Sequence, residues 1–357
     1  RGLGDVYKRQ ATDYEQEVSH LSEDQENAMI EQAARQRASD IHIEALESRV
    51  RIRYRIDGVL YEKASYDIRL LNAITARIKI IGGMDISEKR KPQDGRITLV
   101  VDRVEYDIRV SILPTVYGEK CVLRLAQKKA LTKDKRELGF TPGELESFDR
   151  MLKHPNGILL VTGPTGSGKS TTLYTALSEL NTEDINIITV EDPVEANLDG
   201  VNQVQVNAKA DMTFASALRS ILRQDPDIIM IGEIRDEETA EIAVQASITG
   251  HLVVSTLHTN SAAGTITRML NMGVEGYLLA DSVIGVIAQR LVRRLCPNCK
   301  QPHKPTEYER KLLNLDDLDE TMIFEAKGCP MCANTGYKGR IGVYEICLLY
   351  TSPSPRD

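Results

Sequence analysis

Nine consecutive residues, 163–171, have the types and spacing that bind phosphate through the backbone. They match the pattern G-x-x-x-x-G-K-[ST], follow the apolar run 158–161 and begin a segment, 170–180, of helix-forming composition. Backbone N–H groups of such a loop close around phosphate oxygens, and the following helix offers its positive end to them. The expected phosphate-binding residues are Gly163, Pro164, Thr165, Gly166, Ser167, Gly168, Lys169, Ser170 and Thr171.

The chemistry expected at this loop is transfer of a phosphoryl group to water. Lys169 would neutralise the β- and γ-phosphates, and the Ser170 hydroxyl would hold Mg²⁺. A carboxylate must also orient water or hold the metal ion, and two apolar runs end in candidates, Glu191 and Glu233. The second run resembles a Walker B strand with Gly232 at the usual Asp position. We expect Glu233 to be a Mg²⁺ or water ligand or the base, and Glu191 to share that task.

Two further groups of polar residues each allow two interpretations. His258 follows the third apolar strand, 252–256, where a histidine can sense the γ-phosphate or couple it to a neighbouring subunit. A purely structural histidine is the alternative. Arg51, Arg53 and Arg55 alternate with apolar residues, and we favour a solvated strand face over a basic binding face.

Four of the six cysteines form two C-x₂-C pairs. The 29 residues between the pairs exceed the common zinc-ribbon spacing, but each pair has the spacing of a zinc knuckle. Four thiolates in a reducing compartment gather when a metal holds them, so we favour tetrahedral Zn²⁺ in a structural role over free thiols. The expected zinc ligands are Cys296, Cys299, Cys329 and Cys332.

Length and composition limit the class of protein. The 357 residues indicate two domains, and a net charge of −7 with 5% aromatic residues counts against a general nucleic-acid binder. No apolar run approaches the roughly 18 residues of a membrane span, and the N-terminus lacks the pattern of a signal peptide. These features predict a cytoplasmic protein whose cysteines are reduced unless they bind metal.

The patterns of apolar residues predict an α/β protein of two domains. Helical and alternating segments indicate a smaller α+β, PAS-like domain, and the later alternation of strands and helices indicates a RecA-like P-loop NTPase domain. We expect a disordered or non-native leader and a final tail foreign to the preceding domain. The expected segments are a leader at 1–20, a small domain at 21–127, a linker at 128–137, an ATPase domain at 138–346 that includes a tetracysteine module at 293–340, and a tail at 347–357.

Together these segments resemble the secretion ATPase superfamily, the ATPases of type II secretion and of type IV pilus assembly. The resemblance covers residues 22–346. In the larger domain it rests on 163–171, 190–195, 222–236, 249–251, 255–260 and the cysteine pairs, and in the smaller domain on 38–44, 92–96 and 106–110.

The resemblance implies a hexameric motor on the cytoplasmic face of the inner membrane. Such a motor hydrolyses ATP with Mg²⁺ to assemble a pilin-like filament and reaches the membrane only through platform proteins, without binding nucleic acid. The family's small domain closes over the nucleotide and presents arginines, which match Arg109 and Arg124. Arg219 and Arg223 match arginines near the family's active site.

Two other classes of protein share some of these features. A hexameric RecA-like nucleic-acid translocase shares the core but requires a basic channel lined with aromatic residues. A non-catalytic zinc module is hard to reconcile with an intact phosphate loop. A GTPase is disfavoured because the chain has no Asn-Lys-x-Asp sequence to read the base.

Overall fold

The computed structural model describes residues 28–127, 131–316 and 320–349. The expected leader at 1–20 and most of the expected tail lie outside these ranges. The chain divides into two compact units, 1–130 and 131–357, which are described separately. No helix in the described ranges is both long and apolar enough to cross a membrane.

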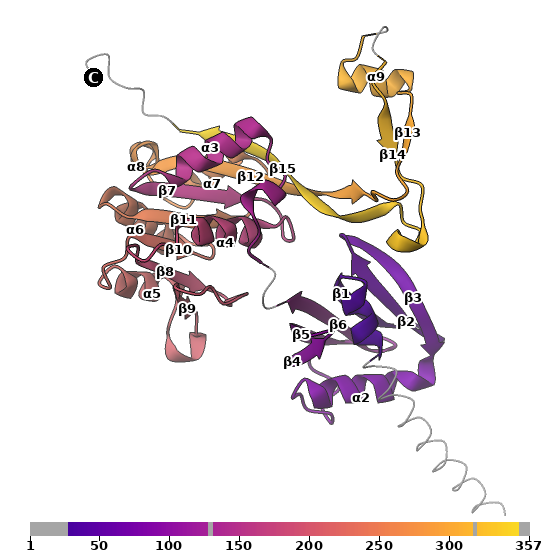
Figure 1. The fold of residues 1–357 in the computed structure, drawn as a ribbon. Helices are drawn as coiled ribbons and strands as arrows, with labels where there is room; N and C mark the ends of the chain where they lie inside the picture. Colours follow the sequence, from indigo (N-terminus) through magenta and orange to yellow (C-terminus); the bar gives the residue numbers. More distant parts are fainter. Residues whose placement is uncertain (1–27, 128–130, 317–319, 350–357) are drawn as a thin grey trace, which may run out of the picture. The chain divides into compact units, whose positions relative to one another are not determined.

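The first unit contains an antiparallel sheet of six strands in the order β3-β2-β1-β6-β5-β4 (Figure 1). Helical residues 28–35 and α2 (Leu71–Ile81) pack on one of its faces. The strands are β1 (Ala38–Ala45), β2 (Arg49–Ile56), β3 (Val59–Asp67), β4 (Gln93–Val101), β5 (Val104–Thr115) and β6 (Gly118–Gln127).

Alternation of residue types along these strands separates a core face from a polar face. Ile41, Ile43, Ile52 and Leu123 are fully or almost fully buried under the helices, at the apolar positions of each alternating strand. The residues between them carry most of the arginines and point to the opposite face. The predicted α+β pattern of this region therefore forms one two-layer core.

The second unit contains a mixed sheet of seven strands in the order β15-β12-β7-β11-β10-β8-β9. All neighbouring strands are parallel except β15, which runs antiparallel to β12. The strands are β7 (Gly157–Thr162), β8 (Ile187–Glu191), β9 (Asn202–Gln205), β10 (Ile228–Ile231), β11 (Leu252–Leu257), β12 (Val283–Leu295) and β15 (Tyr337–Leu348).

Helices cover both faces of this sheet, so its central strands are apolar on both sides (Figure 1). Ile158 and Leu160 of β7 face a cluster formed with α5 to α8, whereas Leu159 and Val161 face α3 and α4. The α/β architecture predicted from the sequence is confirmed. The helices are α3 (Pro142–Leu152), α4 (Lys169–Leu180), α5 (Phe214–Ile221), α6 (Glu237–Ile248), α7 (Ala262–Asn271) and α8 (Gly276–Ser282).

The cysteine-containing segment is inserted between β12 and β15. Its regular elements are the strands β13 (Gln301–His303) and β14 (Ile323–Glu325), which pair with each other, and the helix α9 (Glu307–Leu313). Pairing of β12 with β15 continues from Gly285↔Leu348 to Leu295↔Tyr337, so both strands lead directly into the module.

The structure differs from the sequence-based expectations in three places. Strands β3, β9, β12, β13, β14 and β15 and helices α8 and α9 were not predicted as elements. Part of the expected linker packs on the second unit, because Lys135 forms ion pairs of 2.7 Å with both Asp149 and Glu179. The sheet also continues past residue 346, since Cys347 of β15 pairs with Val286 of β12.

A buried ion pair in the first unit leads to a prediction about stability. Lys79 of α2 is 1% exposed and lies 2.7 Å from Glu119 of β6, and its Nζ also donates to the Glu88 carbonyl at 2.7 Å. Removing one partner leaves an uncompensated buried charge, so we expect Lys79→Met to lower the free energy of unfolding by about 3–5 kcal/mol.

Denaturant unfolding of Lys79→Met beside Lys79→Met/Glu119→Gln tests this expectation. The double variant should be more stable than the single variant, because the unpaired carboxylate is gone. Equal or greater destabilisation in the double variant would contradict an electrostatic origin.

Candidate phosphate-binding site and tetracysteine cluster

The loop at 163–168 joins the end of β7 to the start of α4. Gly163, Gly166 and Gly168 have φ angles of 147°, 78° and 88°, which residues with a side chain adopt only with strain. Gly168 occupies the N-cap position of α4, so no side chain caps the first N–H groups of this helix. The backbone at this end of α4 is arranged to receive an anion.

Lys169 lies at the inner side of the loop. Its Nζ donates to the carbonyl oxygens of Gly163 at 2.8 Å and Pro164 at 3.2 Å, and the residue is 8% exposed. Burial lowers the pKa of Lys169, and Arg290 acts in the same direction, whereas Glu233 and Glu195 raise the pKa. The charges of two carboxylates and one arginine therefore act on the lysine.

Glu233 lies just beyond β10 and meets two side chains there. Arg235 Nη2 donates to its Oε1, and His258 Nε2 lies 3.5 Å from its Oε2. The Glu233 side chain is 16% exposed, and its charge acts on Lys169. Lys169, Glu233 and His258, predicted from three separate segments, therefore come together beside the phosphate loop.

The environment of His258 favours its neutral form. Burial lowers its pKa below the ordinary value of 6.5, and the charge of Lys169 lowers it further, although Glu233 opposes the shift. A neutral imidazole can donate one hydrogen bond and accept another. Proton sharing between His258 and Glu233 is thus compatible with the geometry.

Glu191 has a different environment, because its carboxylate is held inside the fold. It is 4% exposed and accepts hydrogen bonds from Thr189 Oγ1 at 2.7 Å, from Gln203 Nε2 at 3.0 Å and from the Tyr174 hydroxyl. Burial raises the pKa of Tyr174, and the hydrogen bond to Glu191 raises it further, so the phenol remains the donor. These donors point Glu191 toward α4 and β9.

Gly232 occupies the usual Asp position because the strands approach closely there. A Cβ at this position would lie 3.3 Å from both the Glu191 Cα and the Val190 oxygen. The Gly232 N–H donates to Val190 O at 2.8 Å, and its carbonyl accepts from Thr256 Oγ1 at 2.7 Å. The nearest carboxylate after this position in the chain is that of Glu233, one residue along.

Arg109 and Arg124 are directly opposite each other on β5 and β6 of the first unit. Arg124 is in turn opposite Asp40 of β1, and its Nε donates to Asp40 Oδ1 at 3.0 Å. The Arg124 side chain is 61% exposed, whereas that of Asp40 is only 8% exposed. Both predicted arginines lie on the polar face of the small unit.

The arginines of β2 occupy this same polar face but are not simply solvated. Arg51 and Arg53 both donate to Glu44 of β1, with Nε–Oε2 distances of 2.9 Å, and Arg53 adds a second bond of 2.7 Å to Oε1. Burial raises the pKa of Glu44, but these arginines outweigh it and lower the pKa to about 2. Arg51 and Arg53 on this face are therefore paired with a carboxylate.

Arg219 and Arg223 lie on and just beyond α5 and have local partners. Arg219 Nη2 donates to Glu238 of α6, while Arg223 donates to the Arg219 carbonyl at 2.9 Å and to Ser220 Oγ at 3.2 Å. None of these contacts involves the phosphate loop of the same chain. Their expected role in binding nucleotide stays a prediction.

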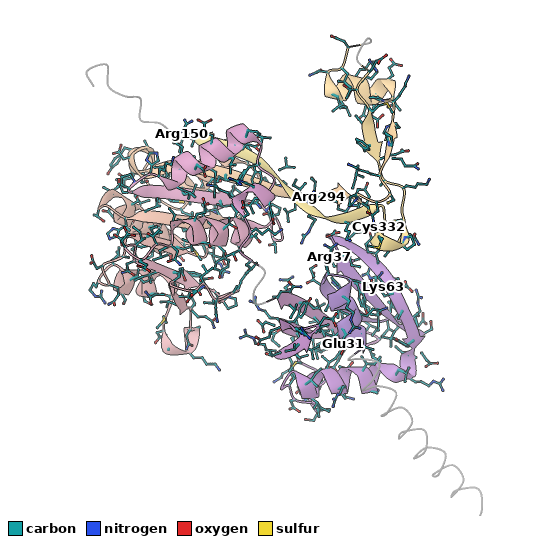
Figure 2. All side chains as sticks on the ribbon, in the orientation of Figure 1. Glu31, Arg37, Lys63, Arg150, Arg294 and Cys332 are labelled. Carbon is teal, nitrogen blue, oxygen red and sulfur yellow. The ribbon has the colours of Figure 1, made fainter. Side chains whose placement is uncertain are left out.

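The four predicted zinc ligands gather in one cluster at the end of the β12–β15 pair, where Figure 2 also shows Arg294 and Cys332. All four sulfurs lie within 4.8 Å of one another, and three Sγ–Sγ distances are 3.7, 3.8 and 3.9 Å. Zn–S bonds of about 2.3 Å in a tetrahedron place sulfurs roughly 3.8 Å apart. The cluster therefore fits a tetrahedral metal ion.

The surroundings of Cys332 favour its thiolate, whereas burial raises the pKa of the Cys299 thiol to about 11. Burial raises the pKa of the Cys332 thiol, but the backbone N–H groups of Cys329 and Gly336, each 3.2 Å from its Sγ, outweigh burial and lower the pKa to about 6. A thiolate is the form that binds zinc.

Three residues near the loop were missed by the sequence analysis. Glu195 acts electrostatically on Lys169, and Gln289 and Arg290 of β12 lie beside the loop. The apolar run 283–288 was the available signal, because it has the composition of a buried parallel strand. Polar residues that follow such a run lie at the edge where α/β proteins bind ligands.

Comparisons with known proteins agree with this geometry. A family model described as type II/IV secretion system protein matches residues 15–354. Type II secretion system ATPase E of Vibrio cholerae is 52% identical over 323 residues, covering 90% of this chain and 64% of that protein. Type II secretion system protein E of Pseudomonas aeruginosa is 55% identical over 322 residues, with the same coverage. The chain thus spans less than two thirds of these relatives.

Two solved structures are similar in fold. The pilus retraction motor PilT with bound ADP has a TM-score of 0.58 and 27% identity, over 91% of this chain and 83% of that one. The ATPase DotB of Legionella pneumophila has a TM-score of 0.63 and 23% identity, over 91% of this chain and 80% of that one.

The pairing of Glu44 leads to a prediction about acid stability. Its pKa falls from 4.5 to about 2 in the folded protein, so its contribution is complete above pH 4.5 and is lost as the pH falls toward 2. We expect Glu44→Gln to be less stable than wild type by about 1.5–3 kcal/mol at pH 7.

Urea unfolding of wild type and Glu44→Gln at several pH values measures this difference. The stability gap should narrow as the pH falls below 4.5. Other carboxylates titrate in both proteins, so their effects cancel in the difference. A gap that does not change with pH would refute the assignment.

Proposed function

Because the chain belongs to the family of type II/IV secretion system proteins, we propose that it is an ATPase motor. It hydrolyses ATP to drive assembly of a pilin-like filament in type II secretion or type IV pilus biogenesis. The observation that carries this proposal is the convergence of Lys169, Glu233 and His258 at a loop whose backbone is arranged for phosphate. The names of the relatives at 52% and 55% identity favour the type II secretion branch.

The proposed reaction is attack of water on the γ-phosphorus of ATP. The new O–P bond forms as the bond to the β,γ-bridging oxygen breaks, and ADP and phosphate are released. Gly163–Thr171 and the start of α4 hold the phosphates, Lys169 neutralises them, and Ser170 and Glu233 would hold Mg²⁺. Bound Mg²⁺ supplies positive charge to the phosphate oxygens.

Glu233 is the better candidate for the residue that orients water and receives its proton. Its side chain is partly exposed and interacts with Lys169 and His258, whereas Glu191 is engaged by three donors. We assign Glu191 a supporting role, in which it fixes the segment after β8. His258 would share the proton with Glu233 or sense the γ-phosphate.

Four arginines complete the proposed site. Arg109 and Arg124 would reach the phosphates when the small unit closes over the nucleotide, which ties turnover to domain motion. Their place on the polar face of the small sheet supports this role. Arg219 and Arg223, whose contacts among the described residues are with α5 and α6, would complete the active site of a second copy of the chain.

We further propose structural Zn²⁺ in the tetracysteine module, a RecA-like class for the large unit and a PAS-like class for the small unit. The Sγ–Sγ distances and the four-ligand set support zinc, since four thiolates fill a tetrahedral ion and leave no position for catalysis. The strand order β2-β1-β6-β5-β4, with β3 added at the edge, supports the PAS-like class.

The motor would act as a homo-oligomer, a hexamer, on the cytoplasmic face of the inner membrane. It would meet the membrane only through the inner-membrane platform proteins of its secretion or pilus system. The net charge of −7 disfavours the alternative, a nucleic-acid translocase, and neither the family nor the relatives support it.

Loss of Lys169 should abolish ATP hydrolysis without unfolding the protein. In Lys169→Ala the phosphates lose their charge partner, while the hydrophobic cores are unchanged. Glu233→Gln is the matched variant, which should bind ATP but turn it over at least about 100-fold more slowly. Phosphate release, equilibrium ATP binding and thermal melting measure the three properties. Turnover near the wild-type rate in Lys169→Ala would overturn the site.

Freshly purified protein should contain one zinc per chain. Elemental analysis should show loss of zinc in Cys329→Ser, because three thiolates hold the ion less tightly. Cys347→Ser is the control, since Cys347 lies exposed in β15 outside the cluster. Wild-type protein without metal, or equal loss of zinc from both variants, would reject the proposed zinc site.

A further inference from the structure

Strand β12 brings two polar residues to the phosphate loop. It runs parallel to β7 with Ile287 opposite Val161 and Ala288 opposite Thr162, so Gln289 follows at the level of Gly163. Gln289 is 2% exposed although its side chain is polar. A buried amide at this position needs hydrogen bonds within the site.

Gln289 contacts both ends of the phosphate loop. A Cβ on Gly163 would lie 2.4 Å from the Gln289 carbonyl oxygen, and a Cβ on Gly168 would lie 2.9 Å from its Nε2. Thr172, in the first turn of α4, donates from Oγ1 to Gln289 Oε1 at 2.8 Å. The loop and the start of α4 are therefore packed against this one residue, through its backbone carbonyl at Gly163 and its side chain at Gly168 and Thr172.

Arg290, the next residue, extends toward a different loop. Its Nη2 donates to Asn260 O at 3.0 Å and to Asn260 Oδ1 at 3.1 Å, and its Nη1 donates to the Gln289 carbonyl at 3.2 Å. Asn260 lies between β11 and α7, two residues after His258. Consecutive residues of β12 thus attach to the phosphate loop and to the loop that carries His258.

We propose that Gln289 and Arg290 are positioning residues. Gln289 holds the phosphate loop and Ser170 in the geometry that binds nucleotide, through its hydrogen bond with Thr172. Arg290 holds His258 at a fixed place relative to that loop, through Asn260. The inference rests on the proposed nucleotide site and adds to it a function for β12, a strand that carries no acidic residue.

The affinity for nucleotide depends on the fraction of molecules in which the phosphate loop has the geometry that binds phosphate. If the Thr172–Gln289 hydrogen bond maintains that fraction, its loss weakens nucleotide binding as well as stability. If Thr172 only fills space, its loss changes stability and leaves affinity unchanged. A shape-conserving variant and a hydroxyl-conserving variant of Thr172 separate these cases.

The experiment measures equilibrium binding of a fluorescent ADP in Mg²⁺, with thermal melting of the same samples. Thr172→Val keeps the side-chain shape and loses the donor, so we expect binding to weaken about three- to tenfold. Thr172→Ser keeps the donor and should bind within about twofold of wild type. Gln289→Met should weaken binding as Thr172→Val does, and the double variant should be no worse than either single variant.

Two outcomes would overturn the Gln289 assignment. One is wild-type affinity in Thr172→Val with only a lowered melting temperature. The other is an additive loss of binding in the double variant. Lys169→Ala is measured in the same series. If it binds the fluorescent ADP as tightly as wild type does, the nucleotide site itself is rejected, and not only the role of Gln289.

Arg290 is tested by Arg290→Lys, which keeps the charge near Lys169 but cannot make both contacts to Asn260. Because His258 is proposed to act at the γ-phosphate, ADP binding should remain within about twofold while kcat falls about tenfold or more. Unchanged kcat would show that Arg290 acts only as a charge and would overturn its positioning role.

Discussion

Parallel hydrogen bonding in the large sheet is the constraint on which the candidate site depends. Because β8, β10, β11, β7 and β12 all run in one direction, their carboxyl ends meet along a single edge. Lys169, Glu233 and His258 follow those ends, and Gln289 lies in β12 directly after the last residue that pairs with β7. Apolar residues on both faces of the central strands bury the sheet between helices, which keeps this edge rigid.

The sequence predicts best those features that depend on local spacing. The phosphate loop, the acids after two apolar runs and the two cysteine pairs can each be read within a few residues. The pairing of strands in the large sheet was harder to predict. The role of β12 depends on its pairing with β7, which is distant in the sequence. Gln289 was missed for this reason. The engagement of Glu191 by Tyr174 and Gln203 likewise depends on packing between three elements and could not be read from β8 alone.

The polar face of the small unit shows how a basic surface is kept ordered. Arginines opposite each other on neighbouring strands repel, as Arg109 and Arg124 do. Asp40 lies in the same row and accepts a hydrogen bond from Arg124, and Glu44 binds the arginines of β2. The sequence 38–44, which resembles the family without an evident chemical role, thus supplies the counter-charges that arrange the arginines.

The continuity of β12 has a mechanical consequence. The same strand begins in the buried sheet, passes the phosphate loop at Gln289 and ends beside Cys296, paired with β15 over most of its length. At about 3.3 Å per residue, the distance from Gln289 to Cys296 is roughly 23 Å. A ribbon of that length works as a lever arm: a tilt of about 5° at the sheet displaces the cysteine end by about 2 Å. A rotation at the proposed phosphate site would therefore be delivered, amplified in displacement, to the cysteine cluster.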